Sequence, residues 1–170
     1  MHVALLALTL VAMSGSPAAT PNAVAPLPHL RPLDPLASDL VSAGIRGSST
    51  FAGLLAALDR ASGLVVYVTT TTEPDHRGSI VFVSRASGVT YLMIRVCTRQ
   101  IDLDRVAVLA HELTHAVEIS RASPPITSDR ELQRLYTCIG VDSTGRRLES
   151  AAAVRAERAV HQEIGKVPTR

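Results

Sequence analysis

The feature that most constrains the fold is a long apolar run, AVLAHELTHAVEIS, which extends from Ala107 to Ser120. Its apolar residues recur at helical spacing and predict an amphipathic helix with a stripe wide enough to pack on a core. That stripe consists of Val106, Leu109, Ala110, Leu113 and Val117. Asp102 is expected to cap the start of this helix, and the Ser-Pro-Pro sequence at 123–125 to break it. The rest of the chain must therefore supply a layer that covers the stripe.

The composition is that of one globular domain. The chain has 170 residues, of which 46% are hydrophobic and 19% charged, and this balance is typical of a folded protein. Aromatic residues make up only 3% and there is no tryptophan, so the core has to be assembled from Leu, Val, Ile and Ala. The net charge of +2 is small and the arginines are scattered, which excludes nucleic acid as an expected partner.

The N-terminus has the pattern of an export signal. An apolar run from Val3 to Met13 is followed by small residues, although only His2 precedes it and a basic n-region is missing. We predict a signal peptide over residues 1–19 and a periplasmic or extracellular protein, with a buried N-terminal segment as the alternative. The run is too short to span a membrane, which takes about 20 apolar residues, so no stable membrane span is expected.

Proline marks the next boundary. Six of the ten prolines lie in the first 35 residues, so residues 20–35 are predicted to form a linker without a regular helix or central strand. The domain itself is placed at residues 36–165. Cys97 and Cys138 match no metal motif, and the sequence leaves open whether they form a disulfide.

Within the domain the pattern predicts an α+β fold. Helices are expected over residues 36–46 and from Ser49, as N-cap, to Gly63. Three β-branched runs follow at 64–70, 79–85 and 89–96, and they are predicted to form a three-stranded antiparallel meander packed on the helix that starts at Asp102 and runs to about Ser120. Two further helices complete the chain, one over 128–140 with a capping box of Ser128 and Glu131, and one over 146–165.

The central helix also carries three side chains in the pattern H-E-x-x-H: His111, Glu112 and His115. Residues four apart lie on one face of a helix, about 6 Å apart along its axis, so both imidazoles can point at one metal ion. Zn²⁺ takes imidazole nitrogens at about 2.0–2.1 Å and acidifies a bound water to a pKa near 7. Glu112 is then placed to act as general base.

With its uncharged flanks, this motif resembles that of the H-E-x-x-H zinc metallopeptidases, the zincins. The resemblance implies one Zn²⁺ ion, a peptide or protein substrate, hydrolysis of the peptide bond, and an antiparallel sheet whose edge strand binds an extended peptide. Glu118 and Arg121 stand where the metzincin branch needs Gly and His, which excludes that branch. The chain is therefore similar to the gluzincin branch, in which a later glutamate is the third metal ligand.

Five glutamates are candidates for that ligand: Glu118, Glu131, Glu149, Glu157 and Glu163. Glu149 is favoured because its small neighbours Ala152, Ala153 and Ala156 let its helix approach the histidines closely, although the gluzincin pattern often has Asp where alanine stands here. Glu131 stays open as an alternative ligand. Glu118 lies about 10.5 Å along the axis from His111, and is expected either to support a histidine or to be a solvated or capping carboxylate.

Two questions stay open at the level of sequence. A peptidase needs a donor for the oxyanion, and no motif selects among Tyr136, His161 and Tyr91. The alternative to a peptidase is a non-enzymatic exported domain of the same fold, with a structural zinc or a partner bound to its sheet. Structural zinc sites are closed by four protein ligands, whereas catalytic sites have three and a water. A third alternative is a helix whose histidines bind no metal.

Overall fold

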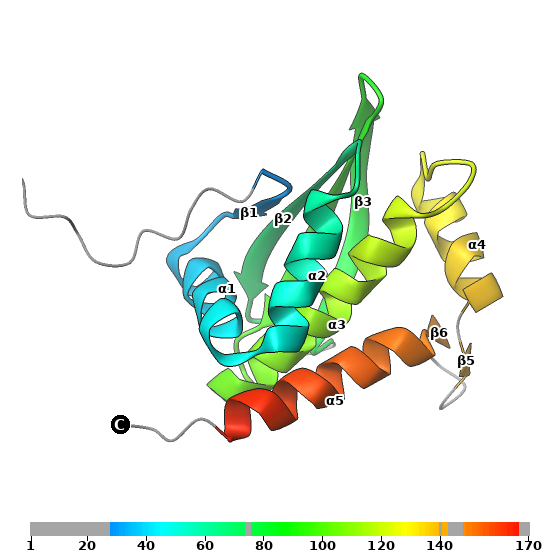
Figure 1. The fold of residues 1–170 in the computed structure, drawn as a ribbon. Helices are drawn as coiled ribbons and strands as arrows, with labels where there is room; N and C mark the ends of the chain where they lie inside the picture. Colours follow the sequence, from blue (N-terminus) through cyan, green and yellow to red (C-terminus); the bar gives the residue numbers. More distant parts are fainter. Residues whose placement is uncertain (1–27, 74–75, 140, 143–147, 167–170) are drawn as a thin grey trace, which may run out of the picture.

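The computed structural model describes residues 28–73, 76–139, 141–142 and 148–166, and Figure 1 shows their arrangement. The elements in chain order are β1 (Leu30–Pro32), α1 (Pro35–Gly47), α2 (Ser49–Asp59), β2 (Leu64–Thr71), β3 (Gly78–Ala86), β4 (Val89–Cys97), α3 (Asp102–Ser120), α4 (Asp129–Ile139), β5 (Val141–Asp142), β6 (Leu148–Glu149) and α5 (Ala151–Gly165). The predicted signal peptide at 1–19 and the first half of the predicted linker, residues 20–27, lie outside the described residues. None of the helices in the described ranges is long and apolar enough to cross a membrane.

The α+β class is confirmed and β3 pairs antiparallel with β4 as predicted, but β2 pairs parallel with β4, so the three strands do not form an antiparallel meander. The main sheet is mixed and four-stranded, in the order β1-β2-β4-β3, with β2 parallel to both β1 and β4, and β3 antiparallel to β4. Strand β4 lies between β2 and β3, and its core-facing side chains are completely buried: Leu92, Ile94 and Val96 are all 0% exposed. Strand β1 lies within the segment that the sequence assigned to the linker, where its proline is tolerated at a sheet edge.

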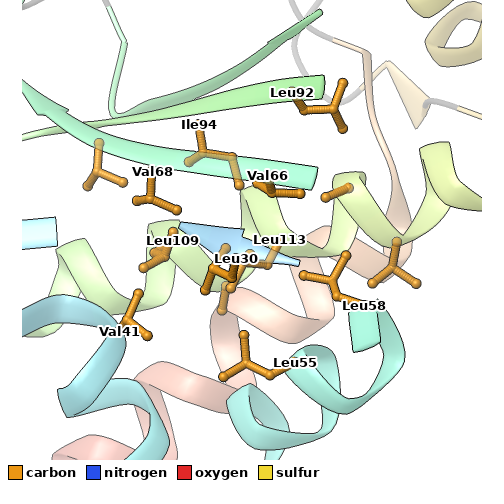
Figure 2. Close-up of a cluster of buried hydrophobic side chains, with 14 of the residues drawn as sticks. Leu30, Val41, Leu55, Leu58, Val66, Val68, Leu92, Ile94, Leu109 and Leu113 are labelled. Carbon is orange, nitrogen blue, oxygen red and sulfur yellow. The ribbon is translucent and has the colours of Figure 1, made fainter. Parts of the chain in front are cut away.

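Helix α3 lies at the centre of the molecule. Helices α1 and α3 pack on the sheet, and α2 and α5 pack against α3 (Figure 1). Figure 2 shows Leu109 and Leu113 of α3 between Val66 and Ile94 of the sheet and Leu55 of α2. Every residue of α3 from Val106 to Val117 is buried. The apolar stripe thus packs as predicted, and α5 also covers the face that carries the histidines.

The helix ends differ from the predicted ones in three places. Ser48, not Ser49, caps α2 by accepting a hydrogen bond from the Phe51 N–H, and that helix ends at Asp59, before Gly63. Helix α3 starts at Asp102, whose carboxylate therefore makes no N-cap hydrogen bond. At Gly63 the backbone has φ +73°, a conformation that favours glycine, and this residue ends the turn that leads into β2.

The third difference concerns the last helix. Ser150 caps α5 by accepting a hydrogen bond of 3.0 Å from the Ala153 N–H. Glu149 therefore lies just before the helix, in the short strand β6, rather than on the helix as predicted. Residues 143–147, which hold much of the predicted turn and the first predicted helical positions, lie outside the described residues.

The remaining local predictions concern α4 and the cysteines. The Ser128 hydroxyl accepts a hydrogen bond of 3.3 Å from the Glu131 N–H, which is the expected cap of α4. The Glu131 carboxylate accepts two bonds of 2.7 Å, from the backbone and hydroxyl of Thr127. Cys97 is buried, Cys138 is exposed, and both are free.

Candidate metal centre

The histidines and glutamate of the motif lie together at the bottom of a cleft. His111, Glu112 and His115 are only 7%, 6% and 5% exposed. They line a space of about 180 Å³ together with Gly78, Ser79, Ile80, Tyr136 and Glu149. The cleft is therefore formed by four parts of the chain: the start of β3, the middle of α3, helix α4, and Glu149 in β6. This volume holds several water molecules but only a small part of a peptide.

The two imidazoles face each other through their Nε2 atoms, which are 3.2 Å apart. The Nδ1 atom of His111 lies 3.0 Å from Glu157 Oε2, and that of His115 lies 2.9 Å from Glu118 Oε2. Carboxylates only accept hydrogen bonds, so both Nδ1 atoms carry the proton and both Nε2 lone pairs point at the same space. Two lone pairs in this arrangement need a proton or a cation between them.

A zinc ion fits this pair. With bonds of about 2.0–2.1 Å and tetrahedral angles, two zinc-bound nitrogens lie about 3.3 Å apart, close to the distance between the Nε2 atoms. Carboxylates that hold the Nδ1 protons are the usual support of zinc-binding histidines. Among the described residues, however, no group of three or more His, Cys, Asp or Glu side chains lies close enough to hold a metal. A three-ligand site therefore requires a further side chain to come closer to the two histidines, and Glu149, the ligand that the sequence predicts, lines the same space.

Glu149 lies near enough to act electrostatically on His111. Burial lowers the pKa of His111. The hydrogen bond with Glu157 and the negative charges of nearby glutamates together raise this pKa by more than burial lowers it, so the net shift is upward. Glu149 is one of those charges, with Glu112 and Glu157. The same negative field that favours a protonated imidazole favours a bound cation.

Glu112 lies against the start of β3. A Cβ atom added to Gly78 would be 2.8 Å from Glu112 Oε1 and 2.5 Å from Val108 Cγ1, closer than real side-chain atoms approach. Only glycine at this position lets the strand come so close to α3. The result is a carboxylate held at the wall of the cleft, one residue from His111.

Two carboxylates hold the histidines, Glu157 of α5 and Glu118 of α3, and the N-cap of α5 contacts the second. Ser150, at this N-cap, hydrogen bonds the Glu118 side chain that holds His115. Glu157, two turns along, holds His111 with one oxygen and pairs with Arg77 Nη1 at 2.8 Å with the other. The hydrogen bond from His111 lowers the pKa of Glu157, burial opposes this and Arg77 adds to the lowering, so the net shift is downward.

Tyr136 adds a proton donor to the cleft. Its ring packs edge-on against His115, with 4.8 Å between ring centroids. Its hydroxyl is buried and has no hydrogen-bond partner among the described residues. Burial and the carboxylates of Glu112 and Glu118 raise its pKa, so it keeps its proton at neutral pH. The sequence did not choose between Tyr136 and two other candidate donors. Tyr136 lies four residues after Leu132, on the buried side of α4, and this spacing could have indicated that its side chain faces inward.

The other candidates lie elsewhere. His161 bonds Asp104 at 3.1 Å, and Tyr91 stacks on Tyr67. Glu163 binds the N-terminus of α2, and Glu131 is bonded to Thr127. The role of Glu157 as partner of His111 was missed; its place on α5, four residues after the buried Ala153, was the sign that it faces α3.

Comparison with known proteins adds no relative. No family model matches the chain, and no curated protein and no solved structure is significantly similar to it.

Proposed function

We propose that this protein is a zinc-dependent, gluzincin-like peptidase in which His111, His115 and Glu149 bind one Zn²⁺ ion and Glu112 is the general base. The observation that carries the proposal is the histidine pair: two Nε2 atoms 3.2 Å apart, each ring held at Nδ1 by a carboxylate. The N-terminal sequence pattern supports an exported protein.

When bound, Zn²⁺ supplies a Lewis acid that polarises a carbonyl and lowers the pKa of water to about 7. Glu112 accepts a proton from the attacking water and passes it to the leaving amine. Tyr136 donates its hydroxyl proton in a hydrogen bond to the carbonyl oxygen as negative charge develops there. Strand β3 pairs only with β4 among the described strands, so its other edge accepts an extended peptide.

The cleft favours catalysis over a structural zinc. A structural site is closed by four protein ligands, whereas the proposed site has three, with Glu149 drawn toward the two histidines, and leaves space beside them. It also contains two groups that a structural zinc would not need, the Glu112 carboxylate and the Tyr136 hydroxyl. Both line the same space as the histidines.

The test combines metal analysis with hydrolysis of a broad peptide library by the purified protein. We expect one zinc per chain in the wild type and in Glu112→Gln. Hydrolysis by Glu112→Gln should fall by a factor of about 10² or more, because the loss of a general base has this size. Glu149→Ala should lose zinc affinity, while Glu131→Ala, the matched control for the other proposed ligand, should not.

Three results would decide against parts of the proposal. Stoichiometric zinc without any hydrolysis across the library would leave the structural-zinc alternative. Full zinc affinity in Glu149→Ala would remove Glu149 as the third ligand, and a loss in Glu131→Ala would replace it. A wild-type protein that binds no zinc would refute the metal site itself.

A further inference from the structure

Arg77 lies one residue before Gly78, where β3 starts. Its guanidinium reaches across to α5, where Nη1 lies 2.8 Å from Glu157 Oε1. The second oxygen of the same carboxylate lies 3.0 Å from His111 Nδ1. One carboxylate therefore connects the arginine to the histidine.

Arg77 is itself fixed at two points. Its Nε donates a hydrogen bond of 3.0 Å to the Gln100 side chain, and the Gln100 amide donates one of 2.9 Å back to the Arg77 carbonyl. Gln100 lies in the turn between β4 and α3. The planar guanidinium thus presents one N–H to Gln100 and another to Glu157, and its rigid geometry sets the orientation of the carboxylate.

We propose that Arg77 is a positioning residue for the metal: it holds Glu157 so that the His111 ring keeps Nε2 directed at the ion. The inference rests on the proposed function. It extends the site to a residue that touches neither metal nor substrate and whose side chain is 57% exposed. It also links the metal ligand to the strand that lines the cleft, since Gly78 follows directly.

Two effects of Arg77 on zinc affinity have opposite signs. As a positive charge near a dication, Arg77 repels the metal, and its removal would tighten binding. As a positioning residue it strengthens binding, and its removal weakens it, because the carboxylate and the ring lose their fixed orientation. The direction of the change therefore separates positioning from simple charge.

The experiment measures zinc affinity of the full chain by competition with a chromophoric chelator, and records the absorption spectrum of the cobalt(II) form. We expect Arg77→Gln to bind zinc about tenfold more weakly, at the lower end of the loss found for outer partners of metal ligands, with a shifted cobalt spectrum. Arg77→Lys, which keeps the charge, should recover part of the affinity. The control is Arg60→Gln, which removes an exposed arginine at the end of α2 and should change neither readout.

A second variant shows whether Arg77 acts through Glu157. Glu157→Gln should weaken zinc binding by itself, and adding Arg77→Gln to it should change little, because the two residues form one chain of contacts. Additive losses, or zinc binding by Arg77→Gln as tight as in the wild type or tighter, would overturn the inference while leaving the proposed function standing. A wild type that binds no zinc would overturn both.

Discussion

Gly78 controls how closely the edge strand approaches the central helix. Its missing side chain leaves room for Val108 and for the Glu112 carboxylate. A methyl group there has no free space, so either the strand or Glu112 must move. In contrast, Gly53 lies within α2 with nothing within 4 Å of an added Cβ.

These two glycines give the first prediction. Gly78→Ala should lower the free energy of unfolding by about 1–3 kcal/mol, the usual cost of overpacking, and should reduce hydrolysis by displacing Glu112. Gly53→Ala should raise stability by about 0.5–1 kcal/mol, because alanine loses less backbone entropy in a helix. Urea denaturation and peptide hydrolysis measure both. Equal changes in the unfolding free energy of the two variants would mean that the structure around Gly78 accommodates a methyl group without destabilisation.

At the scale of elements, α5 organises two distant parts of the molecule. Its first half supports the histidines through Ser150 and Glu157. Near its end, the Glu163 carboxylate accepts hydrogen bonds from the Ser48 hydroxyl at 2.6 Å and from the Thr50 N–H at 3.1 Å. A carboxylate at the N-terminus of α2 also interacts favourably with that helix's dipole.

The second prediction concerns the pH dependence of this contact. Hydrogen bonds from Ser48 and Thr50 lower the pKa of Glu163 to about 2, from 4.5. Because the folded-state pKa is the lower one, the stabilisation is complete above about pH 4.5 and is lost as the pH falls toward 2. Glu163→Gln should therefore cost about 1 kcal/mol at neutral pH, and the difference from wild type should shrink below pH 4.5.

Denaturant unfolding from pH 7 to pH 3 measures this difference. Asp39→Asn is the control, since it removes an exposed carboxylate from α1 and should leave stability within about 0.5 kcal/mol of the wild type. A gap between wild type and Glu163→Gln that stays constant with pH would show that the carboxylate charge does not stabilise the contact.

At the scale of the whole molecule, α3 lies between the sheet and helices α2 and α5, so the candidate metal site and the core share one helix. A ligand that binds only the folded state stabilises it in proportion to its concentration over Kd. We therefore expect free zinc at 100 times Kd to raise the unfolding free energy by about 2.7 kcal/mol.

The third prediction follows: a strong chelator should lower the Tm of zinc-loaded protein, and added zinc should restore it. Glu112→Gln should show the same zinc-dependent rise, whereas the His111→Ala/His115→Ala double variant should show none. Thermal unfolding monitored by circular dichroism checks all three. A rise of equal size in the double variant would place the stabilising zinc outside the histidine pair.

The strand order shows where sequence patterns reach their limit. The β-branched runs identified β2, β3 and β4, because alternation and turn residues are local properties. They did not show that β4 inserts between β2 and β3, since strand order depends on contacts between distant parts of the chain. The alternation in β2 and β4 is equally compatible with either position, because Val66 and Val68 are as completely buried as Leu92 and Ile94.

The candidate site likewise has a part that the local sequence predicts and a part that depends on how the elements pack. Sequence alone determined that His111, Glu112 and His115 lie on one helix with both imidazoles on one side, because four residues make about one helical turn. The pairing of His115 with Glu118, three residues along the same helix, is also local, whereas the pairing of His111 with Glu157 depends on the tertiary structure. Glu157 lies 46 residues from His111 and meets it only because α5 packs along α3, just as Gly78, Tyr136 and Glu149 reach the cleft from three separate parts of the chain. Contacts between residues so far apart depend on how whole elements pack, and no local pattern specifies that packing.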